Sequence, residues 1–217
     1  FGAIFGFAMG SLIHFFELPP FLVTLVGMFL ARGGAFLVSL NAIPIKHDFI
    51  YDLLDIGIPL GFRVRMPLTA IIFIFCVLVG IYVLHFTKFG RVTYAIGSSE
   101  PSAILMGLPV GRTKILIYTL SGILSALGGI VYSIYTSSGY PLACVGLELD
   151  VIAAVVIGGT LLTGGAGMLE GTLIGVLILG LIQTFINFQG TLSSWWTKIV
   201  IGILLFIFIL LQRYLST

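Results

Sequence analysis

The sequence has very little charge. Only 8% of its 217 residues are Asp, Glu, Lys or Arg, whereas 59% are hydrophobic. Soluble domains carry about 25% charged residues, so this composition is far from that of an ordinary soluble domain. The net charge of +2, with no basic block longer than two residues, gives no indication of nucleic-acid binding. We therefore expect an integral membrane protein.

Cysteines and catalytic motifs are also scarce. The two cysteines, Cys76 and Cys144, are too far apart in the chain to form a CxxC redox pair or a metal cluster. No GxxxxGK[ST] phosphate loop occurs, so the chain has no Walker site for ATP. A rhomboid-like protease requires Gly-x-Ser-Gly, but Thr119 stands two positions before Ser121. The sequence predicts neither an enzyme nor a cofactor, and energy for an active process must come from another subunit.

The sequence is rich in long apolar runs. Backbone polar groups cannot stay unpaired in lipid, and the runs do not alternate with period two, so they predict helices and not barrel strands. With about 20 residues per crossing, we predict an all-α polytopic helical membrane bundle, a single transmembrane domain over residues 1–217. Its seven approximate spans are 1–16, 21–40, 68–86, 115–135, 149–163, 171–188 and 195–211. The fifth is short and flanked by glycines, which leaves open a broken or re-entrant helix.

Several glycines are spaced for close helix packing. Gly2, Gly6 and Gly10 form a doubled GxxxG pattern, and Gly171 with Gly175 forms another. Small residues let helix backbones approach each other in lipid, where no hydrophobic effect drives association. We interpret both groups as packing faces, within this subunit or toward a second copy, and not as substrate sites.

One polar segment interrupts the apolar runs between the third and fourth spans. Pro101 suits a first helical position, Ser98, Ser99 or Glu100 can cap a helix there, and Gly107 suits a left-handed stop. We predict one short helix of about seven residues. Its apolar side chains, which need a groove, are Ala103, Ile104, Leu105 and Met106. It is a docking helix for a soluble partner, an amphipathic helix in the headgroups, or a turn packed on its own bundle.

Four stretches carry a resemblance to a known family. The first three are PPFLVTLVGMFLARGGAFLV, YAIGSSEPSAILMGLPVGRTKILIYTLSG and VGLELDVIAAVVIGGTLLTGGAGMLEGTLIGVLILGLIQ. They resemble the transmembrane permeases of ribose- and galactose-type ABC importers, across essentially the whole chain. The last stretch, INFQGTLSSWWTKIVIGILLFIFILLQR, is similar to galactofuranose importer permeases in particular.

The resemblance implies a multi-pass subunit of an ATP-driven sugar importer in the bacterial inner (plasma) membrane, for galactofuranose or a related monosaccharide. It implies three partners: an ATP-binding cassette ATPase subunit, a periplasmic sugar-binding protein, and a second permease subunit in a homo- or heterodimer. Residues 88–114 are then a cytoplasmic coupling segment. Its expected ATPase contacts are Ser98, Ser99, Glu100, Pro101, Ala103, Leu105, Met106 and Gly107. The family has about ten spans, so roughly three are expected before Phe1.

A few charged residues lie within or beside the predicted spans, where ionisable groups are costly and are functional candidates. Arg32 can anchor its helix by snorkelling to the interface or can line the pathway. Glu148 and Asp150 can cap the start of the fifth run, or can face the pathway and bind sugar hydroxyls. Interfacial anchors are predicted at the start of the last span, at Trp195, Trp196 and Lys198.

Two alternatives to a sugar importer stay open. One is a permease of the same superfamily for another small polar solute, such as a different pentose or hexose or a branched-chain amino acid. The other is a stand-alone secondary transporter or channel. Ion-coupled transporters tend to carry buried carboxylates in the middle of their spans, whereas every acid here falls in a loop or at a span end. That distribution disfavours the second alternative.

Overall fold

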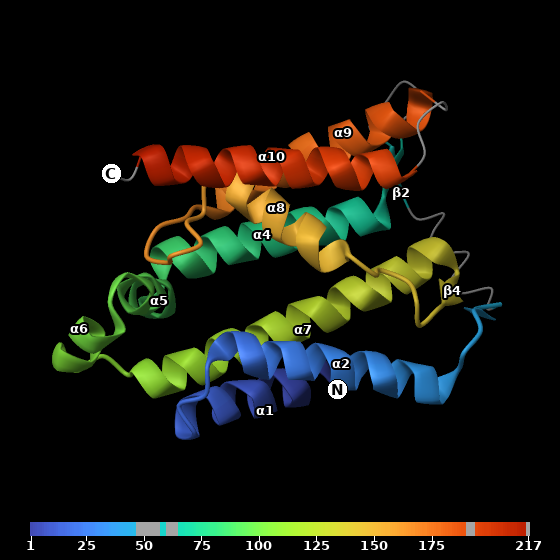
Figure 1. The fold of residues 1–217 in the computed structure, drawn as a ribbon. Coiled ribbons are helices and arrows are strands. Elements are labelled where there is room, and N and C mark those ends of the chain that lie inside the picture. The colour runs from blue at the N-terminus through green and yellow to red at the C-terminus, as the bar shows by residue number, and fades with distance from the viewer. Residues whose placement is uncertain (47–56, 60–64, 190–193, 216–217) are drawn as a thin grey trace. The chain divides into compact units, whose positions relative to one another are not determined.

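The computed structural model describes residues 1–46, 57–59, 65–189 and 194–215 (Figure 1). Its helices are α1 (Gly2–Phe15), α2 (Pro20–Val38), α4 (Leu68–Phe86), α5 (Lys88–Ser98), α6 (Glu100–Leu105), α7 (Val110–Thr136), α8 (Leu147–Ile157), α9 (Leu169–Gln189) and α10 (Ser194–Leu215). Short strands are β1 (Ile43–Pro44), β2 (Gly57–Pro59), β3 (Arg65–Pro67) and β4 (Ser138–Gly139). Residues 47–56, 60–64 and 190–193, which lie between predicted spans, are outside the described residues.

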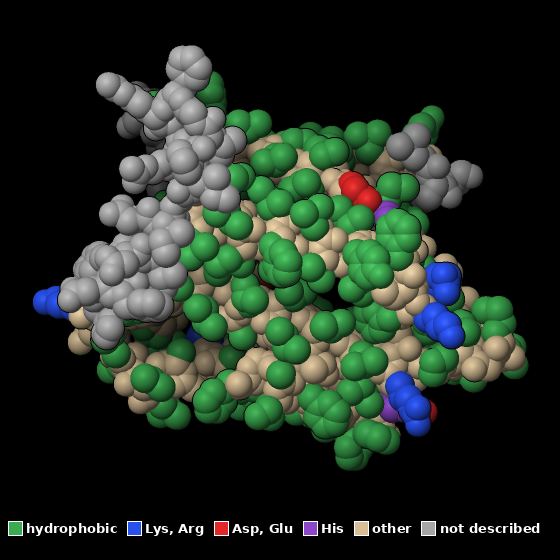
Figure 2. Space-filling view, turned by 180° about the vertical axis from the view of Figure 1, so that it is seen from behind, with side chains coloured by type: hydrophobic (Ala, Val, Ile, Leu, Met, Phe, Trp, Pro, Cys, Tyr) green, Lys and Arg blue, Asp and Glu red, His purple; other side chains and the backbone are tan. Residues whose placement is uncertain are grey.

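Four of the described helices are long and apolar enough to cross a membrane. They are α2, α4, α7 and the Leu169–Ile186 part of α9, and the apolar stretches Gly2–Phe15 and Trp196–Gln212 are shorter. Many of their hydrophobic side chains are exposed, and on the face drawn in Figure 2 hydrophobic side chains are spread widely, whereas Lys and Arg are few. The predicted fold class, an all-α polytopic membrane bundle, is confirmed.

Two predicted boundaries differ from the structure. The fifth predicted span reaches residue 163, but α8 has only 11 residues and ends at Ile157. At 1.5 Å per residue it is about 17 Å long, well short of the roughly 30 Å hydrocarbon core, so α8 alone cannot cross. The fourth span was expected from residue 115, but α7 begins at Val110 and has 27 residues. Arg112 and Lys114 therefore belong to a helix and not to a polar loop.

The chain forms two compact units, one of Phe1–Leu78 with Met106–Ala143, and one of Val79–Leu105 with Cys144–Thr217. In the first unit, α1 and α7 run antiparallel along a glycine seam. A Cβ at Gly2 would meet the carbonyl oxygen of Gly122, one at Gly6 that of Tyr118, and one at Gly10 would lie 3.0 Å from the Cα of Ile115. The first predicted glycine group thus lies where two helix backbones touch.

Two short antiparallel strand pairs also belong to the first unit. β1 pairs with β4, with Ile43 opposite Gly139, and β2 pairs with β3, with Ile58 opposite Met66. The β1–β4 pair ties the chain after α2 to the end of α7. Ser137, which precedes β4, ends α7 in the left-handed conformation at φ +49°.

In the second unit, α8 and α9 make a comparable close contact. A Cβ at Gly171 would meet the carbonyl oxygen of Gly158, and one at Gly175 would meet that of Ala154. Beside this seam a small core joins α8, α9 and α10. Its buried residues are Ala153, Ala154, Ile157, Leu179 and Ile201, with Leu205 and Phe208 packed against them. α10 therefore lies along α8.

We predict that Gly122→Ala destabilises the first unit, because the added methyl group meets the backbone of Gly2 and must push α1 away. Overpacking of this kind costs about 1–3 kcal/mol. Gly128→Ala is the matched control in the same helix, since nothing lies within 4 Å of a Cβ there. Thermal unfolding of the detergent-solubilised protein checks both variants. Equal melting temperatures for the two would contradict the glycine seam.

Candidate functional site

The polar segment contains two helices and not the single helix predicted. α4 ends at Phe86, and α5 begins after a sharp bend at Thr87, whose hydroxyl accepts a hydrogen bond from the amide of Gly90 at 3.3 Å. A Cβ at Gly90 would meet the carbonyl oxygen of Leu84, so the bend requires glycine there. α5 is not predicted from the sequence because its many polar residues resemble those of a loop.

The second helix, α6, occupies the predicted position. Of the three candidate caps, Ser99 performs the role: its hydroxyl accepts from the amide of Ser102 at 3.4 Å, and its carbonyl accepts from the amide of Ala103 at 3.0 Å. Ser98 belongs to the end of α5, and Pro101 is the second residue of α6 and not the first. Gly107 takes the left-handed conformation at φ +72° after the helix, as predicted.

The apolar residues of α6, together with Met106 directly after it, divide into two groups. Ala103 is fully buried, whereas Ile104, Leu105 and Met106 are 58%, 87% and 65% exposed. We call these last three the exposed triplet. Ala103 is covered by the protein itself, whereas the triplet is on its surface. Ala103 was among the expected ATPase contacts, but its side chain is not on the surface, so it cannot contact a partner directly.

α5 packs on the glycine-rich turn that precedes α9. The Tyr94 hydroxyl donates to the carbonyl of Gly167 at 2.8 Å, and a Cβ at Gly97 would lie 2.8 Å from the amide nitrogen of Gly165. Gly164 and Gly165 have φ of +89° and +81°, a conformation that glycine adopts without strain. The turn therefore needs its glycines both for its own shape and for the approach of α5.

A polar contact links the end of α4 to the start of α9. His85 Nδ1 lies 3.4 Å from Glu170 Oε1, and both side chains are partly exposed. Leu169 packs against Gly80, where a Cβ would lie 2.6 Å from one of its methyl carbons. Glu170 lies in the first turn of α9, where a negative charge is favoured by the helix dipole. Through these contacts α4, α5 and α9 are joined around one turn.

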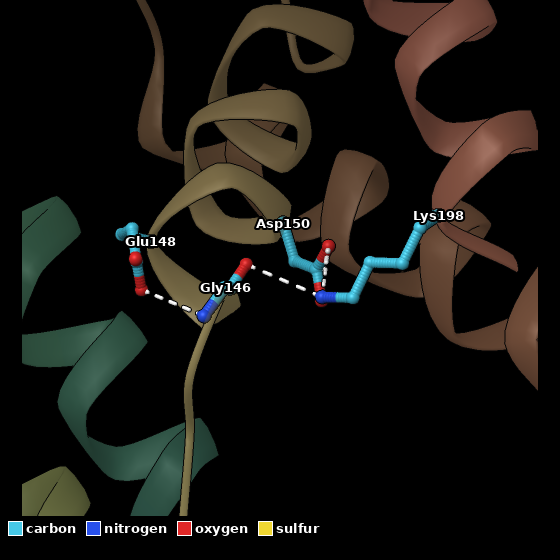
Figure 3. Close-up of polar contacts among 4 residues, drawn as sticks. All are labelled: Gly146, Glu148, Asp150 and Lys198. Carbon is cyan, nitrogen blue, oxygen red and sulfur yellow. Dashed lines mark hydrogen bonds and ion pairs between the residues drawn. The ribbon is translucent and has the colours of Figure 1, made fainter. Parts of the chain in front are cut away.

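The two acidic residues predicted at the start of the fifth run both contact polar groups there (Figure 3). Gly146 precedes α8 in the left-handed conformation, and its amide donates to Glu148 Oε2 at 3.1 Å. Asp150 Oδ2 lies 3.3 Å from Lys198 Nζ, which also donates to the carbonyl of Gly146 at 3.4 Å. These contacts match the capping interpretation of Glu148, and they give Lys198 a partner in addition to its predicted place at the interface.

A residue that the sequence analysis missed holds the other end of α8. Gln212, near the end of α10, donates from Nε2 to the carbonyls of Val156 and Thr160, each at 3.2 Å. Helix C-termini leave carbonyls without intrahelical partners, and in lipid such groups must find one. Lys198 and Gln212 thus hold both ends of the short α8 from one helix. The only sequence signal was a glutamine inside an apolar run.

The three predicted pathway residues do not all lie in the same unit. Arg32 is a half-buried residue of α2 in the first unit, and within the described residues it makes no ion pair or hydrogen bond. Glu148 and Asp150 lie in the second unit. The side chain of Trp195 lies outside the part that the structure describes.

Comparison with known proteins gives a consistent match. The model of a family described as "Branched-chain amino acid transport system / permease component" matches residues 1–209. The chain is 54% identical, over 99% of its length, to the inner membrane ABC transporter permease protein YjfF of Escherichia coli K12. It is 41% identical over 98% to the fructose import permease protein FruG of Bifidobacterium longum, and 38% identical over 98% to the ribose import permease protein RbsC of Escherichia coli K12.

The aligned region covers 65%, 64% and 66% of these three relatives, so the chain spans slightly less than two thirds of their length. No solved structure matches the chain.

We predict that Gln212→Leu destabilises the second unit by about 1–3 kcal/mol, because it leaves two carbonyl groups without their donor. Gln183→Leu on α9 is the matched control, since within the described residues the Gln183 side chain makes no hydrogen bond. Unfolding in detergent, followed by circular dichroism, measures both variants. If the control lost as much stability as Gln212→Leu, the contact with α8 would not be the cause.

Proposed function

Because the chain belongs to the family described as the permease component of branched-chain amino acid transport systems, we propose that it is the membrane-spanning subunit of an ATP-driven importer. In this proposal it carries a sugar across the bacterial inner membrane. The observation that carries the proposal is the exposed triplet at the end of α6, an apolar surface on a short helix and the residue after it, outside the apolar runs. An ATPase subunit with a complementary groove would cover it.

The contacts around α5 support a role in transmitting movement. α6 follows α5 after one residue, and α5 is fixed to the glycine-rich turn by Tyr94 and Gly97. The turn leads directly into α9, and the contact between His85 and Glu170 joins α9 to α4. A displacement of α6 by a partner would therefore reach two long helices through packed backbone and not through a flexible loop. Residues 88–114 then serve as the coupling segment.

The positions of the acidic residues support an external energy source. In the described part of the chain, Glu148, Asp150 and Glu170 all lie in the first turns of helices, and Glu17 lies between α1 and α2. None is at the centre of a long helix, where a carboxylate coupled to protons or sodium is expected. A partner ATPase fits this distribution better than an ion gradient.

The solute is proposed to be a monosaccharide. Two of the similar proteins are named for fructose and for ribose import, whereas the family description names branched-chain amino acids. The resemblance of the last stretch, residues 186–213, to galactofuranose importer permeases favours galactofuranose among the sugars. We further propose a periplasmic sugar-binding protein that delivers the solute and a second permease subunit, identical or not, that completes the pathway.

We predict that Leu105→Asp abolishes copurification with the ATPase subunit and lowers solute uptake at least tenfold, because a carboxylate cannot enter an apolar groove without a partner. The side chain is 87% exposed, so folding should be unchanged. The variant is made in the full-length protein, expressed with its partners, and assayed by pull-down and transport. Leu142→Asp, at another exposed leucine outside the coupling segment, is the matched control and should behave as wild type.

Retention of both ATPase binding and uptake by Leu105→Asp would overturn the coupling assignment. Loss of both by Leu142→Asp as well would indicate a general effect of the substitution and would equally remove the support for α6.

We predict that cells lacking their native permeases take up labelled galactofuranose when they express the full-length protein with its partners. Ribose, galactose, fructose and leucine are tested in parallel, and each uptake is measured with and without a catalytically dead ATPase. ATP-dependent uptake of leucine alone would overturn the sugar assignment in favour of an amino acid. Uptake that survives the dead ATPase would overturn the importer class itself.

A further inference from the structure

The first unit contains a cavity of about 820 Å³ among α1, α2 and α7. Sites for small organic molecules have volumes of roughly 300–1,000 Å³, so the cavity is large enough for a monosaccharide. Part of its wall is the glycine seam, since both Gly2 and Gly122 line it. The close approach of α1 and α7 therefore forms one side of the cavity.

Hydroxyl groups gather on one wall of this cavity. Tyr118, Ser121 and Ser125 line it from α7, at the spacing i, i+3 and i+7 that places residues on one helix face. Thr24 adds a fourth hydroxyl from α2. Most of the other lining residues are apolar. An apolar cavity with a few convergent polar groups is the usual form of a small-molecule site.

The hydroxyls of Ser121 and Ser125 differ from others on the same helix. Thr113, Thr119 and Thr136 each donate to the carbonyl four residues earlier, at 2.7–2.9 Å. Within the described residues, Ser121 and Ser125 make no hydrogen bond from their side chains. A hydroxyl at membrane depth is unfavourable without a partner. Water or a solute in the cavity would supply that partner.

The other lining groups suit a neutral solute. The cavity has aromatic side chains at Phe1, Phe5 and Tyr118, and none of its lining side chains is charged. Stacked rings and hydroxyl groups fit the apolar faces and hydroxyl edges of a sugar. A zwitterionic amino acid would instead need charged or strongly dipolar partners for its two ends. The wall chemistry favours a polyhydroxylated molecule.

A second cavity in the same unit provides a contrast. It has a volume of about 300 Å³, lies between α1 and α2, and is lined only by apolar residues. Among its lining residues are Leu12, Leu18, Leu22 and Leu30. It offers no hydrogen-bonding side chain, so it does not suit a sugar. The hydroxyl wall is thus a property of one cavity and not of the unit in general.

We infer that the cavity among α1, α2 and α7 is a transit site for a neutral, polyhydroxylated solute, with Tyr118, Ser121 and Ser125 as its binding hydroxyls. The inference rests on the proposed function, and it adds the residues that the solute contacts. The site binds weakly, because a pathway must release what it binds. Its hydroxyls exchange hydrogen bonds with the solute as it passes.

Transport kinetics of the full-length importer, reconstituted in proteoliposomes with its ATPase and binding protein, test the inference. The double variant Ser121→Ala/Ser125→Ala should raise the KM for sugar uptake or lower its maximal rate at least about fivefold, because the solute loses two hydrogen-bond partners. Ser125→Leu should reduce uptake further by filling the cavity. Ser133→Ala and Ser133→Leu, at a serine of α7 outside the cavity, are the matched controls. ATPase copurification should be unchanged in all variants.

A second test measures whether a cysteine placed in the cavity reacts with a thiol reagent. A folding defect would not imitate protection of that cysteine by the sugar. Cys76 and Cys144 are first replaced by alanine, and Ser125→Cys is then exposed to a small hydrophilic thiol reagent in proteoliposomes. We expect modification that slows in the presence of the transported sugar. Ser133→Cys, the matched control, should show no protection by the sugar.

Each other outcome overturns the inference. Reaction only with a lipid-soluble reagent would show that lipid fills the cavity, and no reaction with either reagent would show that protein fills it. If the wild type transports sugar and the Ser121 and Ser125 variants transport it equally well, the transit site is refuted, whereas the proposed importer function is retained. If wild type shows no ATP-dependent sugar uptake, the proposed function fails and the site loses its substrate.

Discussion

Close contact between helix backbones at glycine is the interaction on which this structure depends. Lipid offers no hydrophobic effect to bring helices together, so association requires backbones that can touch. The contacts at Gly6 in the first unit and Gly175 in the second meet that need, and in both units the partner is a backbone carbonyl. Two other features depend on the same contacts. The α1–α7 contact forms part of the wall of the large cavity, and the α8–α9 contact fixes the position of the short α8.

The second unit uses glycine in a different way around the coupling segment. Gly164 and Gly165 supply left-handed turns, and Gly97 lets α5 lie directly on them. The Tyr94 hydroxyl donates to the carbonyl of Gly167 in the turn, and Glu170 directly after the turn contacts His85 of α4. Because α5 is packed against this turn, it cannot move independently of the turn. A fixed helix of this kind suits the coupling segment, which must transmit a movement and not absorb it.

Much of the fold was predictable because the membrane restricts the choice. Apolar runs of crossing length must be helices in lipid, and a capped start with a following glycine predicted α6 and the left-handed Gly107. α5 was missed because hydrogen-bonded backbone outside the lipid does not require apolar side chains. The early start of α7 was missed for the same reason, since Arg112 looked like part of a loop. The contact of Gln212 with α8 joins residues 56 positions apart, so it could not be predicted from any local sequence pattern.

α8 is held at both ends by side chains of a single neighbour, with Lys198 at one end and Gln212 at the other. A contact at each end opposes both sliding and rotation of α8 against α10, so we expect the two helices to move together. α8 is also joined to α9 at Gly171 and Gly175, so a movement that enters α9 from the glycine-rich turn carries α8 and α10 with it.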